Sequence, residues 1–440
     1  MKTPRLDLDY FLQYFAQSEK PKSDWKIGLE QELLGFWTGR WQRLSFADSI
    51  DGLLEHFSSR YGWKGYFEDS YRIGLKKDGS SITLEPGGQL EFSIVPIASL
   101  LEVEATLREY QSHLQELSLG MGWTWLSMGY DPYLRVDQIP WVPKARYKVM
   151  GEYLPPLGEG ALHMMKATCT AQSNLDYSSE ADMVAKMRVA TAVAPFVNIL
   201  FASSPFAEGR LAGCKSRRGW TWSVMSPRHS GFLELIFQPD FGYRQYIEYI
   251  LDVPMLVLER DSKVIDTRGQ NFRQFIEQGF GDLQPEPVDW KTQLGATFPV
   301  ARLRNAIETR TADAGPLSHL VGQAAFWKGL LYDETSLAQA QSLIEQIGYR
   351  FFKAVHDDAF CKGFEYLDAN PHTDQVLGDL VEWAKAGLVR IGLGEERLLE
   401  PVERIYEERT SLADRLIKGF RQGQSIEDLV AQEQLVFAQG

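Results

Sequence analysis

The sequence predicts an α+β protein with a mainly antiparallel sheet followed by a helical C-terminal region. Segments with strand-like alternation concentrate before residue 315, whereas helical periodicity prevails from about residue 316 onward. An Asp78-Gly79 pair between two strand-like runs is typical of a hairpin turn. The 440 residues are 44% hydrophobic and 24% charged, which is usual for a folded chain with a large core.

The chain up to residue 130 alternates short helical and strand-like patterns. Leu6, Tyr10, Phe11, Tyr14 and Phe15 have helical spacing, and the helix should end before Pro21. Period-two patterns and aromatic content then predict strands, with two amphipathic helices between them. The predicted strands are 25–36, 71–76, 81–85, 89–94 and 123–130, and the predicted helices are 50–61 and 97–119.

After residue 130 comes a stretch rich in proline and glycine, 131–160, which predicts a long loop. Capping-box character at Ser178–Asp182 opens a helix to about residue 201. We predict a catalytic domain over 1–335 and a helical region over 336–440. The other predicted strands are 167–175 and 231–237, and the other predicted helices are 244–251, 272–277, 317–331, 336–351, 373–386 and 398–421.

Net charge and cysteine content restrict the classes of partner and the cellular compartment that fit this chain. The formal charge of −13 argues against nucleic acid as a main partner. Cys169, Cys214 and Cys361 form a sparse, odd set, so we expect inert reduced thiols rather than disulfides. The apolar run 189–206 contains polar residues and a proline, which favours a buried helix over a membrane span. We therefore expect a cytoplasmic protein without membrane partners, either a monomer or a homodimer.

Acidic residues occupy predicted strands at positions where apolar residues are usual. Glu30 and Glu32 are two apart, so a strand would present both carboxylates on one face. Glu85 and Glu91 flank Pro86-Gly87-Gly88, which could bulge the register. Clustered carboxylates need a compensating cation, and their oxygens suit Mg²⁺ or Mn²⁺. A solvated sheet face with harmless glutamates would explain Glu30 and Glu32 equally well.

A second polar run extends from Arg302 to Asp313. On a strand, Glu308 and Arg310 would share a face and offer a carboxylate for a cation beside a guanidinium for phosphate. An exposed helix with an Arg304–Glu308 ion pair fits the same residues.

Three further groups could contact substrates. Lys144 and Arg146 could clamp phosphates, although a charged surface loop fits them too. Gln172 and Asn174 would share a strand face and could bind substrate or form a polar ladder. The run 215–222 mixes arginines and tryptophans, as in anion or cation–π sites. No GxxxxGK[ST] loop, GxGxxG turn, GxSxG elbow or HExxH motif occurs.

Taken in order, these runs resemble the glutamate–cysteine ligases of the plant and proteobacterial type. Any single match would be weak, but many in sequence order are strong. They are 27–32, 84–91, 143–147, 168–176, 178–183, 201–206, 251–255, 302–313 and 326–333.

The resemblance implies a glutamine-synthetase-like fold with a curved, mainly antiparallel sheet, helices on its outer face and the site on its concave face. It also implies an ATP-dependent ligase that converts the γ-carboxylate of L-glutamate to an acyl phosphate, which the amino group of L-cysteine attacks. This reaction begins glutathione synthesis. Glu30, Glu32, Glu85, Glu91 and Glu308 would hold two or three Mg²⁺ ions, with Mn²⁺ as a substitute.

The same resemblance distributes the remaining roles. Arg310 and Glu308 would be catalytic; Lys144, Arg146, Arg302 and Arg310 would contact the nucleotide or acyl phosphate; and Gln172, Asn174, Arg218 and Trp220 would bind substrate.

One segment departs from the family pattern. Where plant-type members have histidine and aspartate near the acceptor amino acid, this chain has Trp220 and Val224. The change leaves open a sister ligase that joins glutamate to a different amine. A non-catalytic scaffold is disfavoured, because uncompensated acids on a sheet are costly.

Overall fold

The computed structural model describes residues 5–260, 263–267 and 269–435. Within them, nine strands form one sheet in which every strand pair is antiparallel. The predicted α+β class with a large antiparallel sheet is confirmed. The strands, in spatial order, are β14 (Ala301–Leu303), β15 (Ile307–Thr309), β7 (Ala171–Leu175), β1 (Ile27–Trp37), β5 (Leu90–Ser93), β4 (Ser80–Leu84), β3 (Tyr71–Lys77) and β2 (Lys64–Glu68), with β6 (Trp123–Leu126) also paired to β1.

One face of this sheet is covered by three long helices. These are α3 (Leu100–Leu119), α6 (Glu180–Leu200) and α11 (Leu317–Tyr332). Along β1, Leu29, Gln31 and Leu33 are fully buried toward this side, and Gln31 accepts a hydrogen bond from Gln111 of α3. Because side chains alternate along a strand, Glu30 and Glu32 must point to the opposite face.

Helix α6 is long and apolar enough to cross a membrane by length and composition alone. However, 83% of its most apolar window is buried inside the protein. Packing against the sheet and against α12 (Glu334–Ile347) and α13 (Tyr349–Lys362) therefore accounts for its hydrophobicity, as predicted for this segment.

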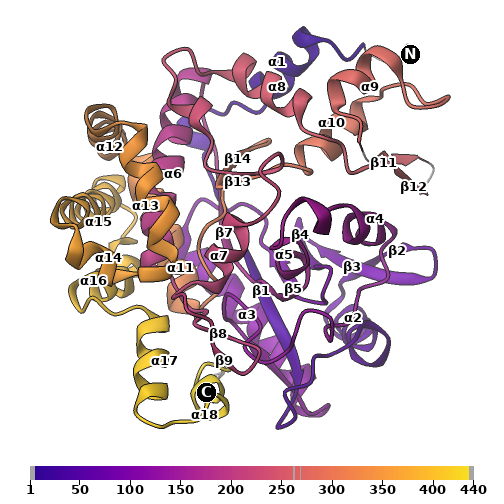
Figure 1. Cartoon of the computed structure of the whole chain (residues 1–440), viewed down its shortest axis with the longest axis vertical. Coiled ribbons are helices and arrows are strands. Elements are labelled where there is room, and N and C mark those ends of the chain that lie inside the picture. The colour runs from indigo at the N-terminus through magenta and orange to yellow at the C-terminus, as the bar shows by residue number, and fades with distance from the viewer. Residues whose placement is uncertain (1–4, 261–262, 268, 436–440) are drawn as a thin grey trace.

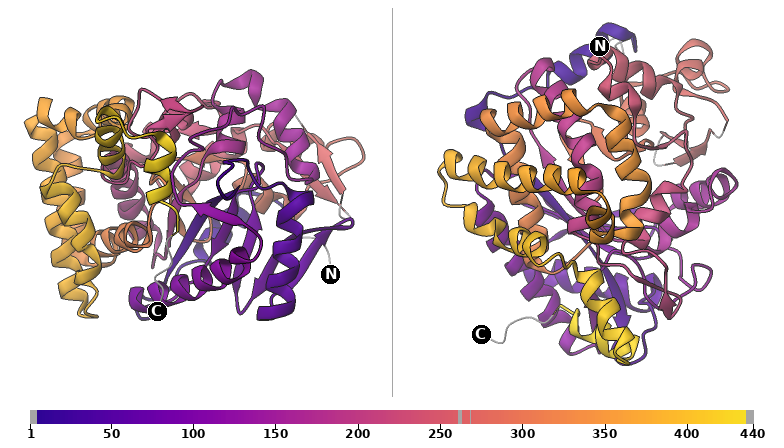
Figure 2. Two further views of the ribbon diagram at one scale, coloured as in Figure 1. Left: turned by 90° about the horizontal axis from the view of Figure 1, so that it is seen from below. Right: turned by 60° about the vertical axis from the view of Figure 1, so that its left-hand side comes forward.

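The helices after residue 316 gather on one side of the molecule, away from β2 and β3 (Figure 1). The helices over residues 334–362, 371–391 and 400–407 pack on α6 or α11 or on one another (Figure 2). The last two helices, over residues 412–432, instead pack against apolar residues of β1 and β6 such as Leu34, Phe36 and Leu126. The division of the chain at residue 335 stays a prediction. These helices are α12 (Glu334–Ile347), α13 (Tyr349–Lys362), α14 (Phe364–Ala369), α15 (Pro371–Ile391), α16 (Glu400–Glu407), α17 (Leu412–Arg421) and α18 (Ile426–Gln432).

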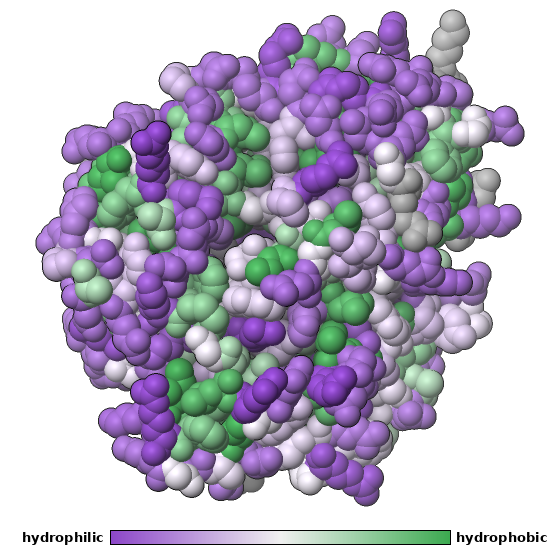
Figure 3. All heavy atoms as spheres, in the orientation of Figure 1, coloured by the Kyte–Doolittle hydropathy of each residue, from purple (hydrophilic) through white to green (hydrophobic). Residues whose placement is uncertain are grey.

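The remaining elements lie around the sheet, and the helix over Asp51–Tyr61 packs beside α3 on the covered face, where Phe57 stacks on Tyr110. The helices are α1 (Leu8–Ala16), α2 (Asp51–Tyr61), α4 (Ala145–Tyr153), α5 (Ala161–Ala167), α7 (Arg217–Ser223), α8 (Tyr243–Asp252), α9 (Phe272–Gln278) and α10 (Pro287–Leu294). The strands are β8 (Phe206–Ala207), β9 (Arg210–Leu211), β10 (Ser230–Gly231), β11 (Val257–Arg260), β12 (Lys263–Asp266) and β13 (Phe298–Pro299). In Figure 3 the face shown is mostly hydrophilic, with hydrophobic side chains in separate groups.

Several predicted elements are wrong. The expected loop 131–160 contains α4, and the expected strand 167–175 begins only at Ala171, because α5 ends at Ala167. The expected strand 231–237 is a 3₁₀ turn over Glu234–Phe237. The expected helix 398–421 is broken between α16 and α17, where Ser411 caps a new helix. Short apolar runs do not distinguish strand from helix without their tertiary neighbours.

The expectation of three unpaired thiols is also wrong. Cys214 and Cys361 form a disulfide that joins the segment before α7 to the end of α13. Cys169 is free and buried, as expected. A cysteine count cannot reveal a single bridge between residues 147 positions apart, since the fold alone brings them together.

Candidate active site

The open face of the sheet carries a continuous row of polar side chains. In the register of β1, Glu30 lies between Gln172 of β7 and Ser93 of β5, and Glu32 lies opposite Glu91 of β5. Both glutamates of β1 therefore share one face, as the spacing predicted. Glu85 is not in a strand: it follows β4 and begins the turn in which Gly88 adopts a positive φ. Its side chain nevertheless lines the same cavity.

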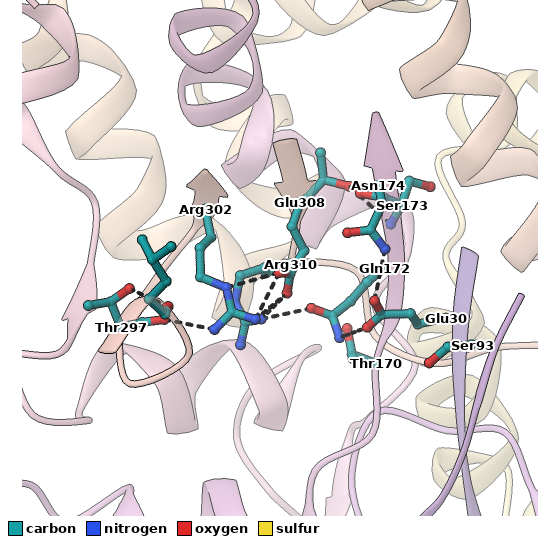
Figure 4. A network of polar contacts seen from close by, with 12 residues as sticks. Glu30, Ser93, Thr170, Gln172, Ser173, Asn174, Thr297, Arg302, Glu308 and Arg310 are labelled. Atoms are coloured by element: carbon teal, nitrogen blue, oxygen red, sulfur yellow. Dashed lines mark hydrogen bonds and ion pairs between the residues drawn. The ribbon is translucent and has the colours of Figure 1, made fainter. Parts of the chain in front are cut away.

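At the edge of the sheet, Arg302 and Glu308 face each other across β14 and β15. Nε and Nη2 of Arg302 each donate to one oxygen of Glu308 at 2.9 Å, in a bidentate pair (Figure 4). Arg310 also donates to Glu308, and its Nη1 donates to Oε1 of Gln172 at 2.9 Å. The predicted strand is therefore present, and an exposed helix with an Arg304–Glu308 pair is not.

The two amides of β7 bind Glu30. Gln172 Nε2 donates to one oxygen of Glu30 at 2.9 Å, and Asn174 Nδ2 donates to the other at 2.8 Å (Figure 4). Gln172 thus links Glu30 to Arg310 through its two ends. As placed, these amides orient a carboxylate within the polar row.

The acidic end of this row has too little positive charge nearby to offset burial and the repulsion between its carboxylates. Burial, with Glu91 and Glu308 nearby, raises the pKa of Glu30 to about 8. Burial and Glu85 raise the pKa of Glu91 to about 7. Burial, Glu85 and Glu91 likewise raise the pKa of Glu32. These carboxyl groups would ionise fully only beside an additional cation.

Glu308 differs from the other acids. Burial alone would raise its pKa, but Arg302, Arg310 and Arg304 outweigh that effect and lower it to about 2. Across the described part of the chain, no three His, Cys, Asp or Glu side chains lie so that they could hold a metal ion in their present positions. A cation here would need the carboxylates to turn toward one another.

The polar row forms the floor of a cavity of about 550 Å³. Acids lie on the floor, while arginines, aromatic rings and methionines form the walls. Besides the residues already named, the lining includes Gln89, Arg146, Tyr147, Met150, Met164, Met165, Thr168, Thr170, Arg218, Trp222, Glu259, Lys291, Thr292, Phe298 and Arg304.

Helix α7 presents Arg218 and Trp222 to this cavity. Ser216 caps the helix by accepting from the backbone of Gly219. Burial lowers the pKa of Arg218 to about 10, and its Nη atoms donate to the carbonyls of Thr311 and Arg310. Trp222 lies one helical turn beyond Arg218, so it faces the same way.

Trp220 does not line the cavity, contrary to the expectation for a substrate contact. Its ring packs instead under the Arg217 guanidinium, 3.6 Å from the ring centroid. The helical geometry of α7 is the reason, since residues two apart on a helix point in different directions.

The two basic residues at the start of α4 also separate. Arg146 lines the cavity, whereas Lys144 lies behind it and donates to the Leu84 carbonyl at 2.8 Å. Lys144 thus supports the end of β4, from which Glu85 follows.

Sequence reasoning missed several lining residues. The sequence assigned Trp220 but not Trp222 as a substrate contact. Thr170, which was not assigned a role, lies opposite Glu32, and its backbone amide donates to Oε2 of Glu32 at 2.9 Å. Phe298, with Trp222, packs against Arg310. The Trp222 position could have been found from the three-to-four-residue spacing to Arg218, had this segment been recognised as a helix.

Comparison with known families settles which group of proteins this arrangement belongs to. The sequence model of glutamate–cysteine ligase family 2 matches residues 26–433 of this chain. The chain belongs to the glutamate–cysteine ligase family. The family and the ligase class expected from the sequence motifs are therefore confirmed.

Among curated relatives, the chain is 36% identical over 439 residues to the chloroplastic glutamate–cysteine ligase of Brassica juncea, covering 98% of this chain and 85% of the relative. It is 35% identical over 431 residues to the chloroplastic glutamate–cysteine ligase of Arabidopsis thaliana, covering 97% of this chain and 82% of the relative. These family members are plastid proteins, so the comparison contradicts the expected cytoplasmic location, and that expectation is wrong.

Among solved structures, the fold is similar to that of a glutamate–cysteine ligase from Francisella tularensis, solved in complex with AMP. The TM-score is 0.53 at 12% identity, covering 94% of this chain and 88% of that one. At this identity the similarity establishes the shared fold.

Proposed function

We propose that this member of the glutamate–cysteine ligase family joins the γ-carboxylate of L-glutamate to the amino group of L-cysteine at the expense of ATP. The observation that carries the proposal is the single row of side chains in which the acids of β1 and β5 meet Arg302, Glu308 and Arg310 inside one cavity. Carboxylates beside fixed guanidiniums suit a reaction that moves a phosphoryl group.

The reaction balances in two steps. The γ-carboxylate oxygen of glutamate bonds to the terminal phosphorus of ATP, and ADP leaves. The amine nitrogen then bonds to the γ-carbonyl carbon, the C–O bond to phosphate breaks, and the nitrogen loses a proton. The products are γ-glutamylcysteine, ADP and phosphate, and the dipeptide is the starting material for glutathione.

The acidic end of the cavity fits divalent cations. Glu30, Glu32 and Glu91 are buried carboxyl groups whose pKa values are raised by one another and by burial, which is the charge deficit that Mg²⁺ or Mn²⁺ would relieve. Glu30, Glu32, Glu85, Glu91 and Glu308 would hold two or three such ions. When bound, the ions neutralise phosphate oxygens and orient the triphosphate.

The protein's own groups position the reactants. Arg310 would neutralise the transferring phosphoryl group. Arg302 holds Glu308 in place by two hydrogen bonds, and Glu308 in turn accepts a hydrogen bond from Arg310 and so orients it. Arg146 and Arg218 would meet the carboxylates of glutamate or the acyl phosphate from the cavity wall. Gln172 and Asn174 would act through Glu30, which both amides bind.

The test is ATP-dependent release of phosphate in the presence of glutamate and a panel of amines. We expect cysteine to be preferred at least tenfold over the other amines. A different preferred amine would instead identify a sister ligase. Calorimetry with Mg²⁺ and a nonhydrolysable ATP analogue adds a second readout, because the absence of binding by the folded protein would contradict any ligase function.

A further inference from the structure

The turn that carries Glu85 contributes almost no side-chain contacts of its own. Glu85 follows β4 and is succeeded by Pro86-Gly87-Gly88, which has no side-chain donor or acceptor. Two backbone bonds close the turn: the Glu85 amide donates to the Gln89 carbonyl at 3.0 Å, and the Gly88 amide donates to the Glu85 carbonyl at 2.9 Å. Besides the strands on either side, groups that bind its backbone from outside must therefore fix its position.

Arg43 is one of these groups. It lies just beyond β1, in an antiparallel bridge with Phe36, and its side chain is buried. Its Nη2 donates to the Gly87 carbonyl at 2.7 Å, and its Nη1 donates to Oδ2 of Asp131 at 3.2 Å. Neither Arg43 nor Asp131 is among the residues that line the cavity. The guanidinium thus joins the turn to a buried carboxylate that takes no direct part in the site.

Asp131 is itself held by backbone groups. Its Oδ1 accepts hydrogen bonds from the amides of Tyr133 and Leu134, at 2.9 and 3.0 Å. Its own amide donates to the carbonyl of Ala167 at 2.8 Å, where α5 ends. Helix α5 contributes methionines to the cavity lining. This guanidinium–carboxylate pair therefore connects the turn to a second part of the cavity lining.

A different part of the chain binds the beginning of the turn. Segment 142–147 donates hydrogen bonds to the carbonyls of Leu84 and Pro86. Arg43 binds the carbonyl of Gly87, at the far corner of the turn. Because the two attachments come from separate segments, loss of Arg43 should free one corner of the turn while the other stays bound. A variant at this position should therefore fold and still lose the fixed geometry of the turn.

We propose that Arg43, held by Asp131, is a positioning residue that fixes the Glu85 carboxylate at the acidic end of the active site. This inference rests on the proposed function, in which Glu85 is one of the carboxylates that hold divalent cations. Glu85 already acts on its neighbours, since its charge contributes to the raised pKa of Glu91 and of Glu32. Removing a group that orients a metal ligand typically weakens metal binding about 10–100-fold.

The first experiment replaces Arg43 by glutamine and measures how phosphate release depends on Mg²⁺. We expect Arg43→Gln to raise the Mg²⁺ concentration for half-maximal rate about tenfold, with KM for glutamate and for cysteine within twofold of the parent. The direction of the change is informative. Removing a cation so near the acids would by itself favour Mg²⁺ binding, so a weaker requirement for Mg²⁺ would indicate a charge effect only.

Asp131→Asn changes the charge in the opposite direction. The amide keeps an oxygen for the Tyr133 and Leu134 amides, but it places an N–H group where Oδ2 accepts from Arg43. We expect the same rise in the Mg²⁺ concentration for half-maximal rate. A rise in both variants reports the position of Glu85 rather than the net charge. Asp131→Asn also serves if Arg43→Gln does not fold.

The matched control is Lys328→Gln. Lys328 is likewise a buried cation that donates to one carboxylate, of Glu395, and to one carbonyl, of Ala98 at 2.8 Å. It joins α11 to the segment before α3 and does not line the cavity. Lys328→Gln should lower the melting temperature, as Arg43→Gln does, but leave the Mg²⁺ requirement unchanged.

Amide hydrogen exchange separates this inference from the proposed function, because it requires no turnover. We expect the Glu85 and Gly88 amides to exchange at least tenfold faster in Arg43→Gln than in the parent or in Lys328→Gln. Parental exchange at these amides, or a parental Mg²⁺ requirement in an active Arg43→Gln, would overturn the inference. A parent that releases no phosphate with any amine would refute the proposed function alone, and the exchange rates would still decide whether Arg43 positions the turn.

Discussion

Arg302 holds Glu308 through two parallel hydrogen bonds across the β14–β15 pair. Both residues are nearly fully buried, so the pair is shielded from solvent. A buried pair of this kind is costly to break, because removing one partner leaves the other uncompensated. The pair also fixes the position of the Glu308 carboxylate, which accepts a hydrogen bond from Arg310.

Replacing Arg302 by lysine should show how much the bidentate contact with Glu308 contributes to turnover. Lysine keeps the charge but cannot make the bidentate contact, so Glu308 and Arg310 should lose their fixed positions. We expect Arg302→Lys to lower kcat at least tenfold in a steady-state phosphate-release assay. Arg108→Lys, in an exposed pair with Glu104, is the control and should retain parental kcat. Parental kcat in Arg302→Lys would mean that the bidentate contact between Arg302 and Glu308 is not needed for turnover.

Neutralising one acid of β1 should weaken catalysis through the cation. We expect Glu32→Gln to lower kcat at least 100-fold, on the scale of lost preorganised electrostatics, and to raise the Mg²⁺ concentration needed for half-maximal rate. A Mg²⁺ titration of initial rates measures both. Glu109→Gln, at an exposed position of α3, provides the comparison. If Glu32→Gln keeps a rate within threefold of the parent, the metal assignment fails.

The two tryptophans of α7 should behave differently. Trp222 lines the cavity and packs against Arg310, whereas Trp220 packs against Arg217 outside it. We expect Trp222→Leu to reduce kcat/KM at least tenfold and Trp220→Leu to change it less than threefold. Steady-state kinetics of both variants, with melting curves to confirm folding, shows which of the two tryptophans contributes to kcat/KM. The opposite order would restore the expectation that Trp220 contacts substrate.

Gly87 should tolerate no side chain. A Cβ there would lie 2.3 Å from the Lys166 carbonyl oxygen, so the turn carrying Glu85 must shift. We expect Gly87→Ala to lower the free energy of unfolding by about 1–3 kcal/mol, the usual range for overpacking. Gly52→Ala, in α2 with no atom within 4 Å of the new Cβ, should instead be neutral or stabilising. Chemical denaturation of the two variants measures the difference.

Acid stability should depend on His319. Burial, with Arg415 nearby, lowers its pKa to about 4, below the ordinary value of 6.5. The unfolded chain therefore takes up a proton that the folded state refuses, and stability falls as pH drops from 6.5 toward 4. Between pH 7 and pH 5 this residue should cost about 2 kcal/mol of unfolding free energy. Denaturation at both pH values should show a smaller loss for His319→Gln than for the parent or for the exposed control His372→Gln.

Local patterns in the sequence determined a large part of this protein. Period-two spacing placed Glu30 and Glu32 on one face, because a strand alternates its side chains whatever its neighbours are. The same rule placed Gln172 with Asn174 and Glu308 with Arg310. The motif series indicated the family and the ligase class. These features depend on residues close together in the chain, so the chain alone encodes them.

Tertiary structure decided how those faces combine. The pairing of β15 with β7 and of β7 with β1 brings Arg310 to Gln172 and Gln172 to Glu30, across separations that no local pattern reports. It also selected Trp222 over Trp220, formed α4 within the expected loop, and joined Cys214 to Cys361. The physical reason is that strand register and helix docking are fixed by contacts between distant segments, whose free energy exists only once the chain has folded.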